Sequence, residues 1–286
     1  MKLVTNTGSL AARFGHLDAI DMIKNAGFDG FDISMDPASN PIFTDDYLAY
    51  AKAVKKRADE RDIPCLQAHS PFARLVSEED VARVLTLHRR SLEICHELEC
   101  PIVVVHPGND FTAEQNFERL YAPLLPLAEH YGVRMATENM WNWDKERDVS
   151  IPVACGTAAD FNAHIDIAGS HYLTGCLDIG HAEMNDSETG AADMIRAMGK
   201  DRISCLHVHD NDKHYDTHTI PFAYTHKRPH HINWESIIEA LREIGYNGHF
   251  TYEAGNFYRH YPDELIPSAL SHMQDIGRYF IKRLTE

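Results

Sequence analysis

Short apolar segments alternate with amphipathic segments along the whole chain. Apolar runs of this kind are typical of parallel strands that are buried on both faces. The segments between them carry apolar residues at helical spacing, which predicts a helix after each strand. Eight such strand–helix units predict a (β/α)8 barrel of the α/β class, the TIM barrel. The eight expected strands lie at residues 2–6, 29–34, 63–69, 101–106, 133–138, 175–181, 203–210 and 249–253.

A doubly wound open sheet is the other arrangement that such an alternation allows. Dinucleotide-binding sheets of that type carry a glycine-rich phosphate loop after the first strand, and none follows residues 2–6 here. The chain has 286 residues, and one TIM barrel typically takes about 250. No low-complexity linker interrupts the sequence, so we expect residues 1–286 to form a single barrel domain.

The acidic composition favours an enzyme that acts on small molecules over a nucleic-acid-binding protein. The chain has 27 Lys and Arg against 43 Asp and Glu, a formal charge of −16. A surface of that charge repels the phosphates of nucleic acids. The sequence has no signal-peptide pattern and no apolar run long enough to span a membrane. We therefore expect a cytoplasmic protein without a membrane or nucleic-acid partner; self-association to a homo-oligomer is left open.

Six of the expected strands end on side chains that bind metals. In a TIM barrel the carboxyl ends of the strands carry the active site, so these side chains are expected to converge on one pocket. The residues are His69, His106, Glu138, Asp178, His181, His207, His209, Asp210 and Glu253.

The last four strands supply a mixed set of oxygen and nitrogen ligands. Glu138, Asp178, His207 and Glu253 lie on consecutive strands and suit one divalent ion. Three carboxylates favour harder ions, so we expect Mn²⁺, with Mg²⁺, Co²⁺ or Zn²⁺ as alternatives. The motif HVHD offers a second histidine, His209, which points the same way as His207 if the strand alternation continues.

The chain resembles the xylose isomerase-like TIM barrel superfamily, which includes ketose epimerases of the D-tagatose 3-epimerase type, inosose dehydratase and endonuclease IV. The resemblance covers nearly the whole chain and rests on AHSPF, VVHPG, TEN, LDIGH, HVHDND, DTH and TYE, in this order. In the epimerases, the residues that match Glu138, Asp178, His207 and Glu253 hold the metal, and the two glutamates move protons. The resemblance also selects the first histidine of HVHD as the ligand.

The resemblance implies three candidate functions. The first is a divalent-metal-dependent isomerase or epimerase of a sugar or sugar phosphate, in which Glu138 and Glu253 act as acid and base through an enediolate. The second is a lyase similar to inosose dehydratase, acting on a keto-sugar or keto-polyol after the same proton removal. The third is a zinc phosphodiesterase similar to endonuclease IV. The nine zinc ligands of that enzyme match His69, His106, Glu138, Asp178, His181, His207, Asp216, His218 and Glu253.

Two features argue against the phosphodiesterase. The acidic charge opposes DNA binding. The Gly-Glu-Gly that follows the last histidine ligand of endonuclease IV is replaced here by IPFAYTHKRPHH. The motifs HPG, DxGH and DxH also occur in sugar-handling relatives that bind one metal. The extra histidines His69, His106 and His181 are therefore expected to bind a carbohydrate substrate. Further metal ligands are the alternative, with Asp216, His218 and His209 as candidates.

Two expected loops complete the pocket. Residues 139–156, after the fifth strand, are expected to form a long loop whose Trp141 packs against the C–H face of a sugar. The loop after the seventh strand carries Arg228, a candidate for binding a phosphate or carboxylate group of the substrate.

Overall fold

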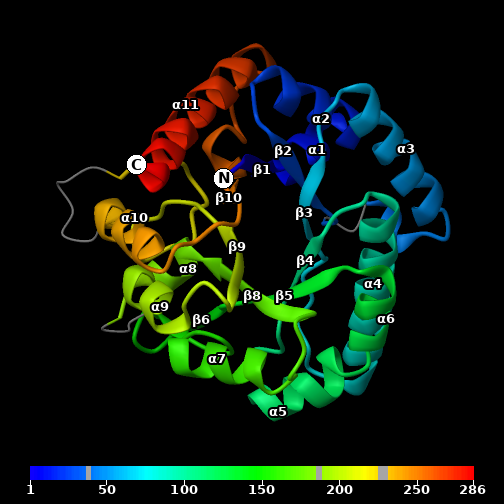
Figure 1. Cartoon of the computed structure of the whole chain (residues 1–286), viewed down its shortest axis with the longest axis vertical. Helices are drawn as coiled ribbons and strands as arrows, with labels where there is room; N and C mark the ends of the chain where they lie inside the picture. Colours follow the sequence, from blue (N-terminus) through cyan, green and yellow to red (C-terminus); the bar gives the residue numbers. More distant parts are fainter. Residues whose placement is uncertain (37–39, 185–188, 225–230) are drawn as a thin grey trace.

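The computed structural model describes residues 1–36, 40–184, 189–224 and 231–286. Eight parallel strands form the centre of the molecule, and helices surround them (Figure 1). The predicted (β/α)8 fold is therefore confirmed. The strands are β1 (Leu3–Asn6), β2 (Gly30–Ser34), β3 (Cys65–His69), β4 (Ile102–Val105), β5 (Arg134–Glu138), β8 (Leu173–Asp178), β9 (Ile203–His207) and β10 (Phe250–Tyr252).

The sheet is closed by a single short junction. The strands follow one another in the order β10-β1-β2-β3-β4-β5-β8-β9, so β9 and β10 are the two ends of the ladder. An isolated parallel bridge between Val208 and Tyr252 joins these ends. Val208 N donates to Thr251 O at 2.9 Å, and Glu253 N donates to Val208 O at 3.2 Å. We call this junction the seam, because it turns the open sheet into a barrel.

Amphipathic helices cover the outside of the barrel (Figure 1). Thr157 is the N-cap of α7, because its hydroxyl accepts a hydrogen bond from Asp160 N at the start of that helix. In the described residues, no helix is long and apolar enough to cross a membrane. The helices are α1 (Gly8–Phe14), α2 (His16–Asn25), α3 (Tyr47–Glu60), α4 (Glu78–Glu97), α5 (Ala113–Asn116), α6 (Leu125–Tyr131), α7 (Ala158–Asp166), α8 (Ile179–Met184), α9 (Ala191–Met198), α10 (Trp234–Glu243) and α11 (Ile266–Thr285), with a π-helical turn at Phe117–Tyr121 and 3-10 turns at Pro41–Phe43, Gly255–Phe257 and Asp263–Leu265.

The last helix is tied to the start of the barrel. Arg278 of α11 donates to both carboxylate oxygens of Asp29, at 2.6 and 2.8 Å, and to Gly27 O at 2.8 Å. Asp29 Oδ2 also accepts from Leu3 N of β1 at 2.8 Å. One carboxylate thus holds the first strand and the final helix together.

Small apolar side chains lie beneath the ligands on three strands of the barrel. Ala136, Cys176 and Cys205 are buried in one cluster, and each stands two residues before a ligand on its own strand. Because side chains in a strand alternate between the two faces, Glu138 and His207 point into the barrel as Ala136 and Cys205 do. The ligand side chains therefore lie at the open end of the barrel, above these apolar residues.

One expected loop is wrong. Residues 139–156 contain an antiparallel hairpin of β6 (Trp141–Asp144) and β7 (Val149–Pro152). Aromatic and β-branched residues alternate with polar ones in both segments, a composition that favours paired strands. Asp144 Oδ1 accepts from Glu146 N and Arg147 N and thereby forms the turn. The polar composition of the segment hid this short pattern.

Candidate active site

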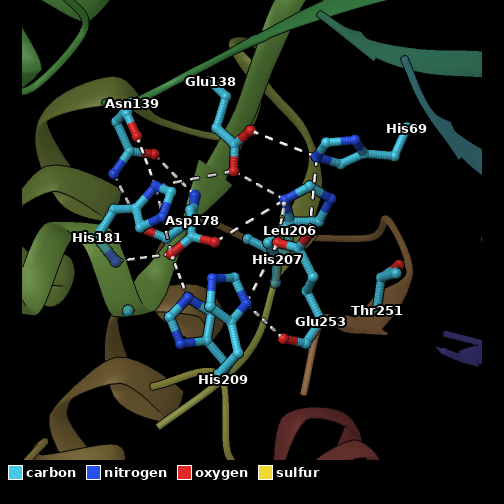
Figure 2. Close-up of polar contacts among 12 residues, drawn as sticks. His69, Glu138, Asn139, Asp178, His181, Leu206, His207, His209, Thr251 and Glu253 are labelled. Atoms are coloured by element: carbon cyan, nitrogen blue, oxygen red, sulfur yellow. Dashed lines mark hydrogen bonds and ion pairs between the residues drawn. The ribbon is translucent and has the colours of Figure 1, made fainter. Parts of the chain in front are cut away.

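Four ligand residues meet at the carboxyl ends of their strands (Figure 2). Glu138, Asp178, His207 and Glu253 each offer one ligand atom, and these atoms lie within 4.8 Å of one another. His207 Nδ1 lies 2.8 Å from Glu138 Oε1, 3.1 Å from Glu253 Oε2 and 3.8 Å from Asp178 Oδ2. We call these residues the first ligand group; it comprises the four residues that the sequence nominates for the metal.

The first ligand group has the donors that a divalent cation requires. Glu138, Asp178 and His207 are buried, whereas the Glu253 side chain is 21% exposed. Among the described residues, Asp178 Oδ2 has no hydrogen-bond partner. Buried polar atoms are nearly always paired, so an unpartnered carboxylate oxygen beside two other carboxylates and an imidazole nitrogen fits a site for a cation.

A second ligand group lies next to the first. His181, His209, Asp216 and His218 also bring one ligand atom each within 4.8 Å of the others. Asp216 Oδ2 lies 3.2 Å from His181 Nε2 and 2.9 Å from His218 Nε2, and Asp216 Oδ1 lies 3.6 Å from His209 Nε2. The two groups touch, because His209 Nε2 is 3.1 Å from Asp178 Oδ1.

A third cluster borders the first group on its other side. His106 Nε2 lies 3.1 Å from Glu138 Oε2. His69 Nε2 lies 4.0 Å from the same oxygen and 3.6 Å from Glu253 Oε1. Glu138 is thus shared by the first group and the histidine pair.

Backbone carbonyls fix the orientation of three of these histidine rings. The Nδ1 atom of His69 lies 3.0 Å from Ser70 O, that of His181 2.9 Å from Asn139 O, and that of His218 2.8 Å from Glu253 O. A carbonyl oxygen only accepts, so Nδ1 carries the proton in each ring. Nε2 of each ring is therefore the nitrogen that is directed at the pocket, as in metal sites where the second nitrogen is held from behind.

Asn139 joins the ends of β5 and β8. Its Nδ2 donates to Asp178 O at 2.9 Å, and its Oδ1 accepts from Asp178 N at 2.7 Å. Asp178 Oδ1 in turn accepts from His181 N at 2.6 Å, at the start of α8. These bonds fix Asp178 and His181 relative to Glu138, which precedes Asn139. The motif TEN contains this residue, but only the fold reveals its partner.

The charges of the site are set by opposing effects of burial and neighbours. Burial raises the pKa of the Glu138 carboxyl, but His207 and His106 outweigh it and hold that pKa well below its usual range. Burial lowers the pKa of His207, yet Glu253 and Glu138 hold it well above the usual value. Asp216 likewise keeps a low pKa despite burial, because His181 and His218 lie beside it. The buried carboxylates of Glu138 and Asp216 are therefore ionised at neutral pH.

A cavity of about 570 Å³ opens above the ligand groups. Among the described residues, Arg74 is the only Lys or Arg that lines it, and no ion pair with a described carboxylate engages its guanidinium. Arg74 lies in a loop and belongs to no motif, so it could not be recognised from the sequence. Other lining residues include Asp36, Phe72, Asn109, Met140 and Asn142.

The structure brings nearly all the candidate residues to this cavity. Trp141, on the hairpin, lines it and meets the His181 ring edge to face at 6.4 Å. His69, His106, Glu138, His181, Asp216, His218 and Glu253 also line it. Asp178, His207 and His209 are fully buried beneath. Arg228 lies outside the described residues.

The family can be stated from a direct comparison of sequences. The sequence model of the xylose isomerase-like TIM barrel family matches residues 20–276. The chain belongs to this family. The Methanocaldococcus jannaschii protein MJ1311 is 30% identical over 202 residues, which make up 66% of this chain and 64% of MJ1311. The chain thus matches slightly less than two thirds of that relative. The Sinorhizobium fredii protein y4fM is 22% identical over 271 residues, 82% of this chain and 79% of y4fM.

Solved structures with the same fold include sugar epimerases. A D-tagatose 3-epimerase-like protein superposes with a TM-score of 0.75 at 20% identity, over 100% of this chain and 98% of the other. The 3-keto-D-glucoside 4-epimerase YcjR from E. coli superposes with a TM-score of 0.69 at 21% identity, over 96% of this chain and 99% of the other. The IolI protein with a bound zinc atom superposes with a TM-score of 0.71 at 16% identity, over 100% of this chain and 98% of the other. Similarity at this identity shows the fold of this family member.

Proposed function

We propose that this protein is a divalent-metal-dependent isomerase or epimerase of a sugar or sugar phosphate. The observation that carries the proposal is the first ligand group, in which two glutamates flank one imidazole at the floor of an open cavity. The sugar epimerases among the structural neighbours support this choice.

The two glutamates are suited to moving protons. Glu253 Oε1 lies 3.6 Å from His69 Nε2 at the edge of the cavity, while Glu138 is 1% exposed and lies deeper. A substrate that enters the cavity therefore meets Glu253 first. One glutamate removes the proton next to the substrate carbonyl to give an enediolate, and the other returns a proton to the opposite face or to the adjacent carbon.

The residues that would hold the ion are Glu138, Asp178, His207 and Glu253. When bound, the ion supplies Lewis-acid polarisation of the substrate carbonyl. Three carboxylates and one imidazole favour Mn²⁺, and Mg²⁺, Co²⁺ and Zn²⁺ are tested beside it. His181 is placed to hydrogen-bond a substrate oxygen, because it lines the cavity.

Exchange of substrate hydrogen with D₂O tests the proposal. A panel of ketoses incubated with the Mn²⁺-loaded protein should gain deuterium at one carbon and yield a new epimer or isomer. Glu253→Gln should abolish exchange while the barrel stays folded, and Glu264→Gln, exposed on the outer surface, should leave it unchanged. Retained exchange in Glu253→Gln would remove Glu253 from the acid/base role.

The same experiment separates the lyase from the isomerase. Both reactions begin with removal of a proton next to a carbonyl, so both incorporate deuterium. A lyase similar to inosose dehydratase would also release water or another leaving group from the neighbouring carbon. Mass spectrometry of the product distinguishes the two results.

The second ligand group favours one other candidate, a multi-zinc phosphodiesterase. His181, Asp216 and His218, together with the cluster of His69, His106 and Glu138, provide ligands for ions beyond the first. About three equivalents of zinc and cleavage of abasic DNA, without exchange on any carbonyl substrate, would establish this activity. We rank it below sugar chemistry because the formal charge of −16 opposes DNA binding.

We infer in addition a small carbohydrate as the partner of this protein and a cytoplasmic location. The cavity lined by His and Asn side chains and by Trp141 suits a polyhydroxylated ligand. Fractionation of the source cells tests the location, and native mass spectrometry tests self-association.

A further inference from the structure

A row of polar side chains crosses the barrel and ends at His207 of the first ligand group. Asp32 of β2, Gln67 of β3, Thr251 of β10 and His207 of β9 are all fully buried. Thr251 Oγ1 donates to Gln67 Oε1 at 3.0 Å, and Gln67 Nε2 donates to Asp32 Oδ2 at 3.3 Å. The row therefore orients the Asp32 carboxylate from one side.

Asp32 has a single ionisable partner in an ion-pair contact within the described chain. His207 Nε2 lies 3.7 Å from Asp32 Oδ2, and both side chains are 0% exposed. Neither His207 Nε2 nor Asp32 Oδ1 has a hydrogen-bond partner elsewhere in the described residues. A buried carboxylate is costly unless donors face it, and the imidazole edge of His207 is the ionisable donor that faces Asp32.

The two nitrogens of His207 face opposite sides. Nδ1 faces Glu138 at 2.8 Å and Glu253 at 3.1 Å, whereas Nε2 faces Asp32. Only Nδ1 is therefore directed at the first ligand group. An imidazole that gives one nitrogen to a metal carries its proton on the other, and a carboxylate behind that proton fixes the ring.

The strand that carries Asp32 is locally distorted. The register between β2 and β3 shifts between Phe31 and Asp32, after which Asp32 stands opposite Gln67. Such irregularities redirect a side chain near active sites. Here the shift brings the carboxylate next to both its donor, Gln67, and the ring of His207.

We propose that Asp32 is a positioning residue for His207. When the first ligand group holds its ion, the Asp32 carboxylate faces the Nε2–H edge of the neutral imidazole and so keeps Nδ1 directed at the ion, while Gln67 and Thr251 hold Asp32 in place. The inference rests on the proposed metal site, and it assigns Asp32 a role behind the ligand rather than among the ligands.

Metal affinity without substrate tests this role. Asp32→Leu should weaken binding of Mn²⁺ or Zn²⁺ about 10- to 100-fold, measured by competition with a chromophoric chelator. Asp32→Asn keeps an acceptor without the charge, so its loss should be smaller. Gln67→Leu should weaken binding less than Asp32→Leu. Circular dichroism and thermal unfolding of the metal-free variants verify that each is folded.

Wild-type and ligand variants make the outcomes distinguishable. Glu138→Gln, which alters a ligand itself, should bind far more weakly than Asp32→Asn. If the wild type binds no ion, the proposed function fails, and this inference fails with it. If the wild type binds and Asp32→Leu binds equally well, only the role of Asp32 is overturned.

A tautomer measurement covers the case in which Asp32→Leu does not fold. Long-range ¹H–¹⁵N spectra of the Zn²⁺-loaded wild type should show His207 protonated at Nε2, and the Nε2 and H resonances should shift in Asp32→Asn. A proton on Nδ1, or spectra of His207 that are identical in wild type and Asp32→Asn, would overturn the proposal.

Discussion

Gly180 packs directly against the ring of His209, so closely that a Cβ on Gly180 would lie 1.9 Å from His209 Cε1. No side chain fits there unless the ring moves. Asn211 Nδ2 fixes the backbone at this point by donating to Gly180 O at 2.9 Å. The glycine of the LDIGH motif is therefore a requirement of the second ligand group.

Gly180→Ala should displace His209 and cost about 1–3 kcal/mol of the free energy of unfolding, the usual range for overpacking. Any ion that binds at the second ligand group should be lost, while the first ligand group should still bind its ion. Urea unfolding and metal analysis measure the two effects. In the double variant Gly180→Ala/His209→Ala the overlap is gone, so the alanine should cost less there than in the wild type; an equal cost would contradict the steric explanation.

Arg74 should bind an anionic group of the substrate. Arg74 lines the cavity and has no described carboxylate partner. Arg74→Ala should therefore raise the KM for phosphorylated ketoses about 10- to 100-fold, as expected for hydrogen bonds to a charged group. The KM for unphosphorylated ketoses should change little. Arg89→Ala, exposed on α4, is the matched control. Equal effects on both substrate classes would exclude this role.

The hairpin should be held over the cavity by stacked aromatic rings. Trp143 of β6 stacks on Tyr215 with ring centroids 5.8 Å apart and planes at 13°. Trp143→Ala and Tyr215→Ala should each raise KM, because the cavity wall loosens. A double-mutant cycle in the free energy of unfolding should give a coupling of roughly 0.5–1.5 kcal/mol. Strictly additive losses would mean that the stacking contributes nothing.

The Asp29–Arg278 pair should stabilise the fold only where Asp29 is ionised. Partial burial raises the pKa of the Asp29 carboxyl, but Arg278 and the Leu3 amide outweigh it and lower that pKa below 3.8. A lowered folded-state pKa gives stability that is present above about pH 4 and is lost as the pH falls through the folded-state value. Asp29→Asn should therefore cost roughly 1 kcal/mol at pH 7.

Urea unfolding at a series of pH values tests this pH dependence. The difference between wild type and Asp29→Asn should shrink below about pH 4. Asp263→Asn serves as the control, since Asp263 lies in an exposed pair with Arg13 and such pairs contribute little. A difference that is constant from pH 7 to pH 3 would assign the effect to packing.

The sequence predicts the barrel and the first ligand group because both follow from short-range patterns. Each ligand stands at the end of an apolar run, and the closed parallel sheet leaves those ends only one place to meet. Asp32 and Arg74 could not be assigned in this way. Asp32 lies within a strand, and its role depends on His207 across the barrel. Arg74 lies in a loop whose course depends on packing.

The histidines also show which features of the site can be predicted from the sequence and which depend on the fold. The strand-end pattern indicates His181 and the family resemblance indicates His218. Which ring nitrogen faces the pocket depends on Asn139 O and Glu253 O, backbone atoms distant in sequence. The hairpin that bears Trp141 was hidden for a related reason, because its strands pair only with each other outside the barrel.

The seam lies directly next to two residues of the first ligand group. His207 immediately precedes Val208, and Glu253 immediately follows Tyr252. One ligand therefore stands on each side of the strand junction that has the fewest paired residues in the described barrel. An ion held by both side chains would link the two strands across the seam. Loading the site should then slow amide hydrogen exchange at Val208 and Glu253 more than elsewhere in the strands. The rigidity of the barrel and the occupancy of its site would be read from the same two amides.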